Sequence, residues 1–339
     1  MGKRFESLTA ALLAAAVILS GCARLRAPSN EGHMLLFSAV GELRPVAPAG
    51  SLFGPGREPL GELKPSLAGR SLVMAGLAGG FDCDPADGAI VWQNDWTGAL
   101  SAANIRVLIL ADDHALDCGR PALADGMNRL LLREFYLAGA GPDQKMARAP
   151  VYLSRDGLTL GVVAFLTAPL PGDSCAACPG PALYDRRAMI AALNEMKSRS
   201  NFRVAVLHFP ERPAPALTAD EQATAREAVD YGADLVLGYG PTAAGGIMRV
   251  RGHWVIGSLG RALGGDGSAD CDCDGLLLSA EFTPEKIMNL RLLPVALDDG
   301  RPRLLRGAEA TAVLQKIIAA APADAAANMN LIGDILYLK

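Results

Sequence analysis

Short apolar runs alternate with amphipathic stretches along this chain. The run RVLILA at 106–111 has the pattern of a strand buried on both faces. The same reasoning predicts strands at 34–40, 71–75, 106–111, 158–166, 203–207, 233–238, 254–257, 276–282 and 290–295. Helical periodicity predicts helices at 97–104, 122–138, 186–198, 218–231 and 308–320. Thr218 and Glu221 form a capping-box pattern at the start of the fourth helix.

The order of these elements indicates the fold class. Strands that alternate with helices predict a layered α/β domain. The last strands follow one another without helices, so part of the sheet is expected to be antiparallel or mixed. Half of the residues are apolar, which is enough for a sizeable core. No repeat is visible, and residues 34–339 are expected to form a single α/β domain.

The first residues have a different organisation. Lys3 and Arg4 precede an apolar run at 8–19, and small residues then lead to Cys22. This pattern predicts a bacterial lipoprotein signal peptide at 1–21, with the Cys22 thiol carrying the lipid. The alternatives are an ordinary signal peptide with a chance cysteine, or a single membrane anchor. The apolar run is shorter than the roughly 18–20 residues that a spanning helix needs.

The lipid on Cys22 predicts an exported protein attached to a membrane. Residues 22–33 are polar and are expected to form a tether. Ala23 follows the lipidated cysteine, which favours the outer membrane, on its periplasmic side, if the source is Gram-negative. The net charge is −4, and no block of Lys and Arg appears, so the sequence gives no indication of nucleic-acid binding.

Six cysteines remain beyond Cys22, and an even number in an exported chain favours disulfides. They are Cys83, Cys118, Cys175, Cys178, Cys271 and Cys273. The C-x-x-C and C-x-C spacings also resemble a four-thiolate zinc site, and C-x-x-C alone can be a redox motif. Structural disulfides are the favoured interpretation.

Polar side chains gather where the predicted strands end. The set comprises Glu42, Asp112, Asp113, His114, His208, Glu211, Tyr239 and Thr242. Sites in α/β domains form at the carboxyl ends of strands, and metal-dependent hydrolases bring carboxylates and imidazoles together there. Each histidine taken singly is more often a hydrogen-bonded structural residue.

The segment ADDHALDCG at 111–119 resembles the ANNHALDYG segment of the CapA capsule-synthesis family. That family is linked to poly-γ-glutamate capsules and is similar to calcineurin-like metallophosphatases. Further blocks agree in order and spacing, namely FSAVGE at 37–42, GAG at 139–141, LHF at 207–209, DYGADLVLG at 230–238 and GSLG at 257–260. The resemblance implies a layered α/β/β/α sandwich of metallophosphatase type with mixed sheets.

The chain departs from the family at the positions that hold metal. Glu42 replaces an Asp, Gly-Leu-Ala at 76–78 replaces Asn-Leu-Glu, and GYGPT at 238–242 replaces GHHPH. The resemblance retains four positions as metal ligands, namely Glu42, Asp113, His114 and His208, and Glu211 is a further candidate. Three of these residues, Asp113, His114 and His208, are also the catalytic candidates. These ligands are too few for a two-metal site, so the protein is expected to bind one divalent ion or no metal ion.

The resemblance also suggests partners for Arg261 and for the cysteines. Arg261 stands where the family has Asn, so its guanidinium is expected to pair with Glu42 or Asp113 in place of a cation. Cys118 replaces the family's Tyr, in a loop that would neighbour Cys83, which predicts a Cys83–Cys118 bridge. The remaining cysteines are expected to pair between the 175/178 and 271/273 clusters.

Three functions follow in order of preference. The first is a metal-depleted, non-catalytic binding or scaffold protein of the cell envelope, with an anionic polymer or an envelope protein as partner. The second is a mononuclear metal-dependent phosphoesterase-like hydrolase that uses His114 and His208. The third is a redox or thiol–metal protein built on the cysteine pairs.

Overall fold

The computed structural model describes residues 33–45, 58–84, 90–92, 96–170, 175–213, 216–264 and 275–339. The chain divides into two units, Met1–His33 and Met34–Lys339, and the second unit is the subject below. The expected signal peptide, Cys22 and the tether up to residue 32 lie outside the described residues. Among the described helices, none is both long and apolar enough to cross a membrane.

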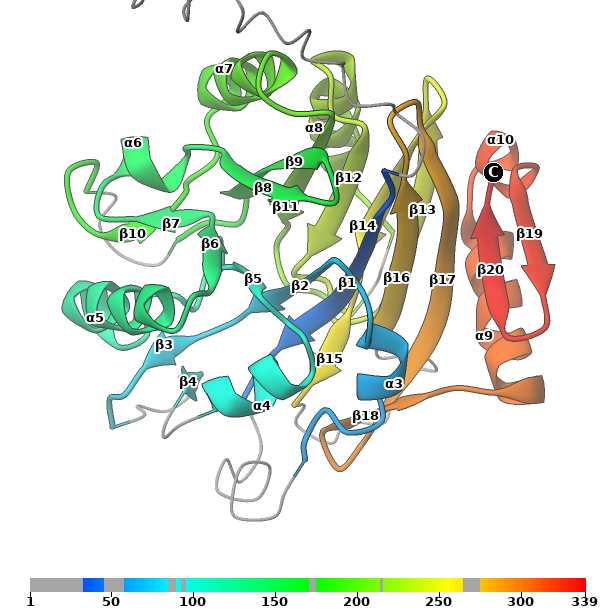
Figure 1. Cartoon of the computed structure of the whole chain (residues 1–339), viewed down its shortest axis with the longest axis horizontal. Coiled ribbons are helices and arrows are strands. Elements are labelled where there is room, and N and C mark those ends of the chain that lie inside the picture. The colour runs from blue at the N-terminus through cyan, green and yellow to red at the C-terminus, as the bar shows by residue number, and fades with distance from the viewer. Residues whose placement is uncertain are drawn as a thin grey trace, which may run out of the picture. The chain divides into compact units, whose positions relative to one another are not determined.

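The larger of two main sheets has the strand order β19-β20-β17-β16-β1-β2-β5-β6, with β15 beside β1 and β18 beside β17 (Figure 1). Its strands are β1 (Leu35–Leu43), β2 (Leu72–Leu77), β5 (Val107–Ile109), β6 (Tyr136–Ala138), β15 (Arg261–Leu263), β16 (Gly275–Phe282), β17 (Ile287–Asp298), β18 (Arg301–Leu304), β19 (Met329–Ile332) and β20 (Ile335–Leu338). Strands β1, β2, β5 and β6 are parallel, whereas β16 and β17 add antiparallel strands. The sheet is therefore mixed, as the run of late strands predicts.

The second sheet has the order β13-β14-β12-β11-β9-β8. Its strands are β8 (Val151–Arg155), β9 (Leu158–Leu166), β11 (Phe202–His208), β12 (Leu235–Tyr239), β13 (Gly245–Val250) and β14 (His253–Ser258). The four central strands are parallel and the two outer strands are antiparallel. Two short ladders join β3 (Gly80–Phe81) to β4 (Val91–Trp92) and β7 (Ala140–Gly141) to β10 (Gly180–Pro181).

Helices cover the outer face of each sheet, and the inner faces share one core. Met74 and Val107 of the first sheet belong to the same buried cluster as Val204 and Leu237 of the second. The outer face of the first sheet is covered by α3 (Lys64–Leu67), α4 (Thr97–Ala102) and α5 (Gly119–Leu132). The outer face of the second is covered by α7 (Arg186–Lys197) and α8 (Ala219–Asp230). The short helices α6 (Gln144–Ala147) and α10 (Ala323–Ala326) and the longer α9 (Gly307–Ala320) complete the unit. This arrangement is the α/β/β/α sandwich that the resemblance implies.

The predicted helix at 122–138 is wrong at its end. Helix α5 stops at Leu132, and residues 136–138 form the parallel strand β6. Glu134 adopts a left-handed backbone conformation with φ of 62°, and the Phe135 N–H donates to the Leu130 carbonyl oxygen. This turn ends the helix and buries Phe135. The capping box at Thr218 and Glu221 forms as predicted.

Of the predicted disulfides, one is confirmed and one pairing is wrong. Cys83 is bonded to Cys118, with a Cα–Cα distance of 5.5 Å. Cys175 is bonded to Cys178 rather than to the 271/273 cluster, with a Cα–Cα distance of 5.3 Å. That distance is ordinary for a disulfide, because the C-x-x-C turn brings both residues close enough to bridge locally. Cys271 and Cys273 lie outside the described residues.

Candidate functional site

The carboxyl ends of parallel strands from both sheets meet at one place. Glu42 lies near the end of β1, Asp112 follows β5, and His208 is the last residue of β11. A bulge at Gly41 shifts the register of β1, since Val40 pairs with Ala75 while Glu42 pairs with Gly76. A Cβ atom on Gly41 would lie 2.4 Å from the Gly260 carbonyl oxygen, so only glycine permits this close approach.

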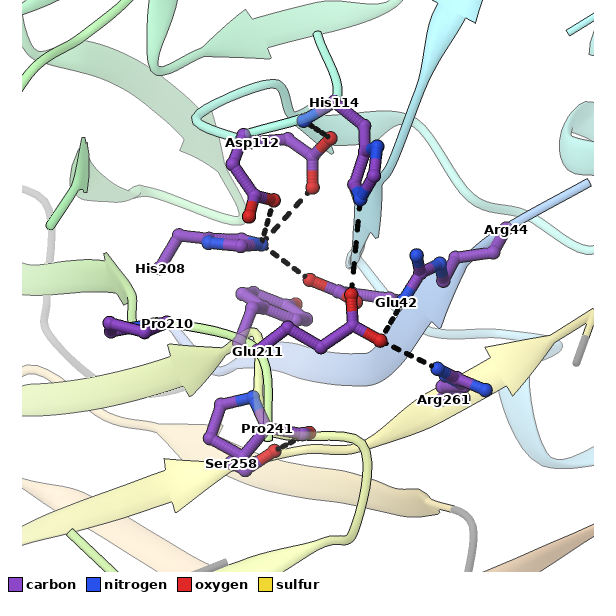
Figure 2. Close-up of polar contacts among 12 residues, drawn as sticks. Glu42, Arg44, Asp112, His114, His208, Pro210, Glu211, Pro241, Ser258 and Arg261 are labelled. Atoms are coloured by element: carbon purple, nitrogen blue, oxygen red, sulfur yellow. Dashed lines mark hydrogen bonds and ion pairs between the residues drawn. The ribbon is translucent and has the colours of Figure 1, made fainter. Parts of the chain in front are cut away.

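Glu42, Asp112 and His208 form a buried cluster that we call the inner group (Figure 2). The Nε2 atom of His208 lies 2.9 Å from Glu42 Oε1 and 3.1 Å from Asp112 Oδ2. The other oxygen of Asp112 accepts hydrogen bonds from the backbone N–H groups of Gly79 and His114. The Asp112 side chain is therefore fixed in orientation.

In the inner group, one imidazole faces two buried carboxylates. Burial on its own would lower the pKa of His208, but the neighbouring Asp112 and Glu42 carboxylates raise it well above its ordinary value. Burial would raise the pKa of Asp112, but His208 lowers it. The raised pKa favours the protonated imidazole, which offsets part of the buried negative charge.

One metal ion could nevertheless be held by the inner group. Its three ligand atoms all lie within 4.8 Å of one another, and two oxygens with one imidazole nitrogen suit a divalent transition metal. Glu42 Oε1 is buried and accepts no hydrogen bond, because the imidazole N–H cannot point at both carboxylates. A cation would satisfy this oxygen, provided that His208 first gave up its Nε2 proton.

A second metal ion does not fit beside the first. Gly76, at the position of the family's Asn, has no side chain to offer, and a Cβ there would already lie 3.0 Å from the Tyr239 ring. Tyr239 occupies the position of a family imidazole, is 1% exposed, and donates its hydroxyl hydrogen to the Val40 carbonyl oxygen. Burial raises its pKa, so it remains a neutral phenol. Neither residue can therefore bind a second ion.

Arg44, His114, Glu211 and Arg261 form a second cluster, the outer group, closer to solvent (Figure 2). Glu211 Oε1 lies 2.9 Å from Arg44 Nη1 and 3.0 Å from Arg261 Nη2. Its Oε2 lies 3.9 Å from His114 Nε2. Arg261 thus pairs with Glu211 rather than with Glu42 or Asp113, which corrects the expectation from the sequence. The reason is that the segment after β11 places the Glu211 carboxylate next to the Arg261 guanidinium.

In the outer group, cationic side chains of the chain surround the single carboxylate of Glu211. Burial would raise the pKa of Glu211, but His114, Arg44 and Arg261 lower it to about 2. A hydrogen bond with Asp117, 2.9 Å from His114 Nδ1, and the proximity of Glu211 raise the pKa of His114 to about 10. The raised pKa favours the protonated form of His114, so a metal ion would have to displace a proton that Asp117 and Glu211 stabilise.

Two further residues of the predicted site lie beside these groups. Asp113 Oδ1 is 3.9 Å from His208 Nε2, and burial raises its pKa. Thr242 is turned to the neighbouring loop, where its backbone N–H and hydroxyl both donate to the Arg212 carbonyl oxygen. Of the residues named from the sequence as ligands, Glu42 and His208 lie in the inner group, and Asp112 takes the place given to Asp113.

Arg44 is the residue that sequence reasoning missed. Its side chain is 9% exposed, and Glu42 and Glu211 outweigh the effect of burial and raise its pKa. The signal was present in the spacing, because residues two apart on a strand point to the same face. Arg44 follows Glu42 by two positions at the end of β1.

Two cavities lie apart from these residues. One of about 200 Å³ is lined by Phe81, Trp96, Arg129 and Arg133, and a larger one borders the Cys83–Cys118 bridge. Both lie along α5. The candidate site is defined by the carboxylates and imidazoles at the strand ends.

The protein is thus an α/β/β/α sandwich with carboxylates and imidazoles at the strand ends. The family model for the bacterial capsule synthesis protein PGA_cap matches residues 53–265, which is more than half of the chain. The chain belongs to this family, which confirms the resemblance in the ADDHALDCG segment. Glu42 and Arg44 lie before the matched range. No curated protein sequence is significantly similar to the chain.

Several solved structures resemble the chain at low identity. A hypothetical protein from Thermus thermophilus has 14% identity and a TM-score of 0.47, over 79% of this chain and 96% of that one. A candidate 5′-nucleotidase from Staphylococcus aureus, in complex with α-ketoglutarate, has 13% identity and a TM-score of 0.45, over 80% of this chain and 53% of that one. The anchor protein of the inner membrane complex of Plasmodium has 12% identity and a TM-score of 0.38, over 85% of this chain and 95% of that one.

Proposed function

We propose that this protein is a cell-envelope lipoprotein whose PGA_cap domain binds a partner and holds its site together without metal ions. One observation carries the proposal: each carboxylate of the two groups faces a cation supplied by the chain. His208 serves Glu42 and Asp112, while Arg44 and Arg261 serve Glu211. These side chains offset negative charge that metal ions would neutralise in a hydrolase.

The location is proposed from the sequence pattern before and at Cys22. Mass spectrometry of the mature N-terminus tests it, with Cys22→Ser as the variant and Cys83→Ser as a control cysteine. A diacylated N-terminal peptide that disappears in Cys22→Ser and persists in Cys83→Ser is expected. An unmodified Cys22 in membrane-fractionated protein would contradict the lipoprotein proposal.

A second function is favoured by the unsatisfied Glu42 oxygen. With one metal ion on Glu42, Asp112 and His208, the domain would be a mononuclear hydrolase; the ion would supply Lewis-acid chemistry. An assay of phosphodiesterase turnover with added Mn²⁺ separates the two functions. His208→Ala removes the imidazole of the inner group, and Glu309→Gln, which removes a carboxylate from an exposed ion pair with Arg303, is the control. The binding-protein proposal expects no turnover above that of His208→Ala. Mn²⁺-dependent turnover that His208→Ala abolishes would establish the hydrolase instead.

A further inference from the structure

The outer group places more positive charge around Glu211 than one carboxylate needs. Two guanidinium groups, from Arg44 and Arg261, converge on the single oxygen Glu211 Oε1. The Nε atoms of both arginines are buried and have no hydrogen-bond partner among the described residues. A guanidinium binds carboxylate or phosphate best through two parallel N–H groups, and here each arginine uses only part of that capacity.

Glu211 differs from the arginines in how it is held. Arg261 begins β15 of the larger sheet, and Arg44, directly after β1, donates its backbone N–H to the Leu263 carbonyl oxygen of β15, so the larger sheet holds both backbones. Glu211 lies in the segment between β11 and α8, and its side chain is 33% exposed, against 9% for Arg44 and 14% for Arg261. Solvent therefore reaches the cluster from the side of Glu211.

The backbone next to Glu211 is fixed. The guanidinium of Arg212 binds both carboxylate oxygens of Glu221 and donates to the Ala216 carbonyl oxygen. The Thr242 N–H donates to the Arg212 carbonyl oxygen. A rotation of the Glu211 side chain alone would therefore uncover both guanidinium groups without unfolding the segment.

We propose that Arg44 and Arg261 form a binding site for a carboxylate or phosphate group, and that Glu211 occupies this site from within the chain until such a ligand replaces it. The exchange conserves charge, because one anionic group leaves and another enters. The incoming group gains the buried Nε–H donors that Glu211 leaves unused. This inference rests on the proposed function, since it gives the binding domain its ligand class.

Calorimetric titration of inorganic phosphate and of succinate, each against chloride at equal ionic strength, tests the site. Glu211→Gln removes the internal anion and should tighten the binding of at least one of them by about tenfold or more. Adding Arg261→Leu to Glu211→Gln should abolish that gain. The preference between phosphate and succinate identifies which oxyanion the site takes.

Glu309→Gln is the matched control, because Glu309 is another carboxylate paired with an arginine, Arg303, far along the chain. The proposal is overturned if Glu211→Gln binds neither anion better than Glu309→Gln does, or if the gain survives Arg261→Leu. If Glu211→Gln lacks the circular dichroism spectrum of the native fold, Glu211→Ala is titrated in its place. Anion binding by the unaltered protein is then also compared with binding by Arg261→Leu, and the same outcomes decide the proposal.

The titrations are run once with chelator and once with Mn²⁺, so that two failures can be told apart. Anion binding that requires Mn²⁺ would overturn both this inference and the metal-free function. Metal-free protein that binds neither anion in any variant would overturn this inference alone.

Discussion

The inner and outer groups neutralise carboxylates in two chemically different ways. In the inner group, Glu42 and Asp112 face His208, whose charge depends on a proton. In the outer group, Glu211 faces two guanidinium groups, whose charge is permanent. A metal ion could displace the proton of an imidazole but not the charge of an arginine. The comparison teaches that the inner group is where metal binding must be tested, and the outer group is where an anion can enter.

The largest effect is expected from His208→Ala, which leaves two carboxylates buried without their cation. Removal of one partner from a buried ion pair costs about 3–5 kcal/mol of unfolding free energy. Urea unfolding measures it, with the more exposed His253→Ala as control, expected to cost about 1 kcal/mol or less. Equal losses in the two variants would mean that His208 does not carry the charge balance of the inner group.

Tyr239→Phe removes the hydroxyl that donates to the Val40 carbonyl oxygen. The carbonyl would lose its buried partner, at an expected cost of about 1–3 kcal/mol. The partly exposed Tyr337→Phe is the control, and its unfolding free energy should change by less than about 0.5 kcal/mol. No difference between the two would show that Tyr239 fills space only.

The two arginines of the outer group should not be equivalent. Arg44 is the more buried, and the charges of Glu42 and Asp112 act on it in addition to Glu211. Arg44→Met is expected to cost about 1–3 kcal/mol, and Arg261→Met less than about 1 kcal/mol, in unfolding free energy. The reverse order would contradict the greater burial of Arg44 and its additional electrostatic interactions with Glu42 and Asp112.

The smallest effect is expected in how the free energy of unfolding of Glu211→Gln depends on acidic pH. The pKa of Glu211 is lowered from its ordinary value of 4.5 to about 2. Its charge therefore contributes stability above the ordinary value, and this contribution is lost as the pH falls through the window from 4.5 to about 2. Glu211→Gln should lose less unfolding free energy across that window than the unaltered protein. Identical acid sensitivity would contradict the ion pairs of the outer group.

The sequence predicted most of the scaffold because the relevant signals are local. Apolar runs located the parallel strands of the two main sheets other than β6 and β15, and the Thr218 capping box located the start of α8. The end of α5 was missed because Glu134 has a left-handed conformation that helical periodicity does not reveal. The Cys175–Cys178 bridge was missed because the local turn geometry decides it.

The candidate site was only partly predictable, since its contacts join segments far apart in the chain. The resemblance identified Glu42 and His208 as site residues. It did not determine whether Asp112 or Asp113 would face the His208 imidazole. Backbone hydrogen bonds from Gly79 and His114 decide that choice. The pairing of Arg261 with Glu211 depends likewise on the path of the segment after β11.

Metal affinity of the inner group tests the central claim most directly. Chelator-dialysed protein is titrated with Mn²⁺ and with Zn²⁺ in a calorimeter, alongside His208→Ala and Glu309→Gln. The account predicts no stoichiometric binding by the unaltered protein, with a trace that matches that of His208→Ala. One ion bound per chain, retained in Glu309→Gln and lost in His208→Ala, would contradict it.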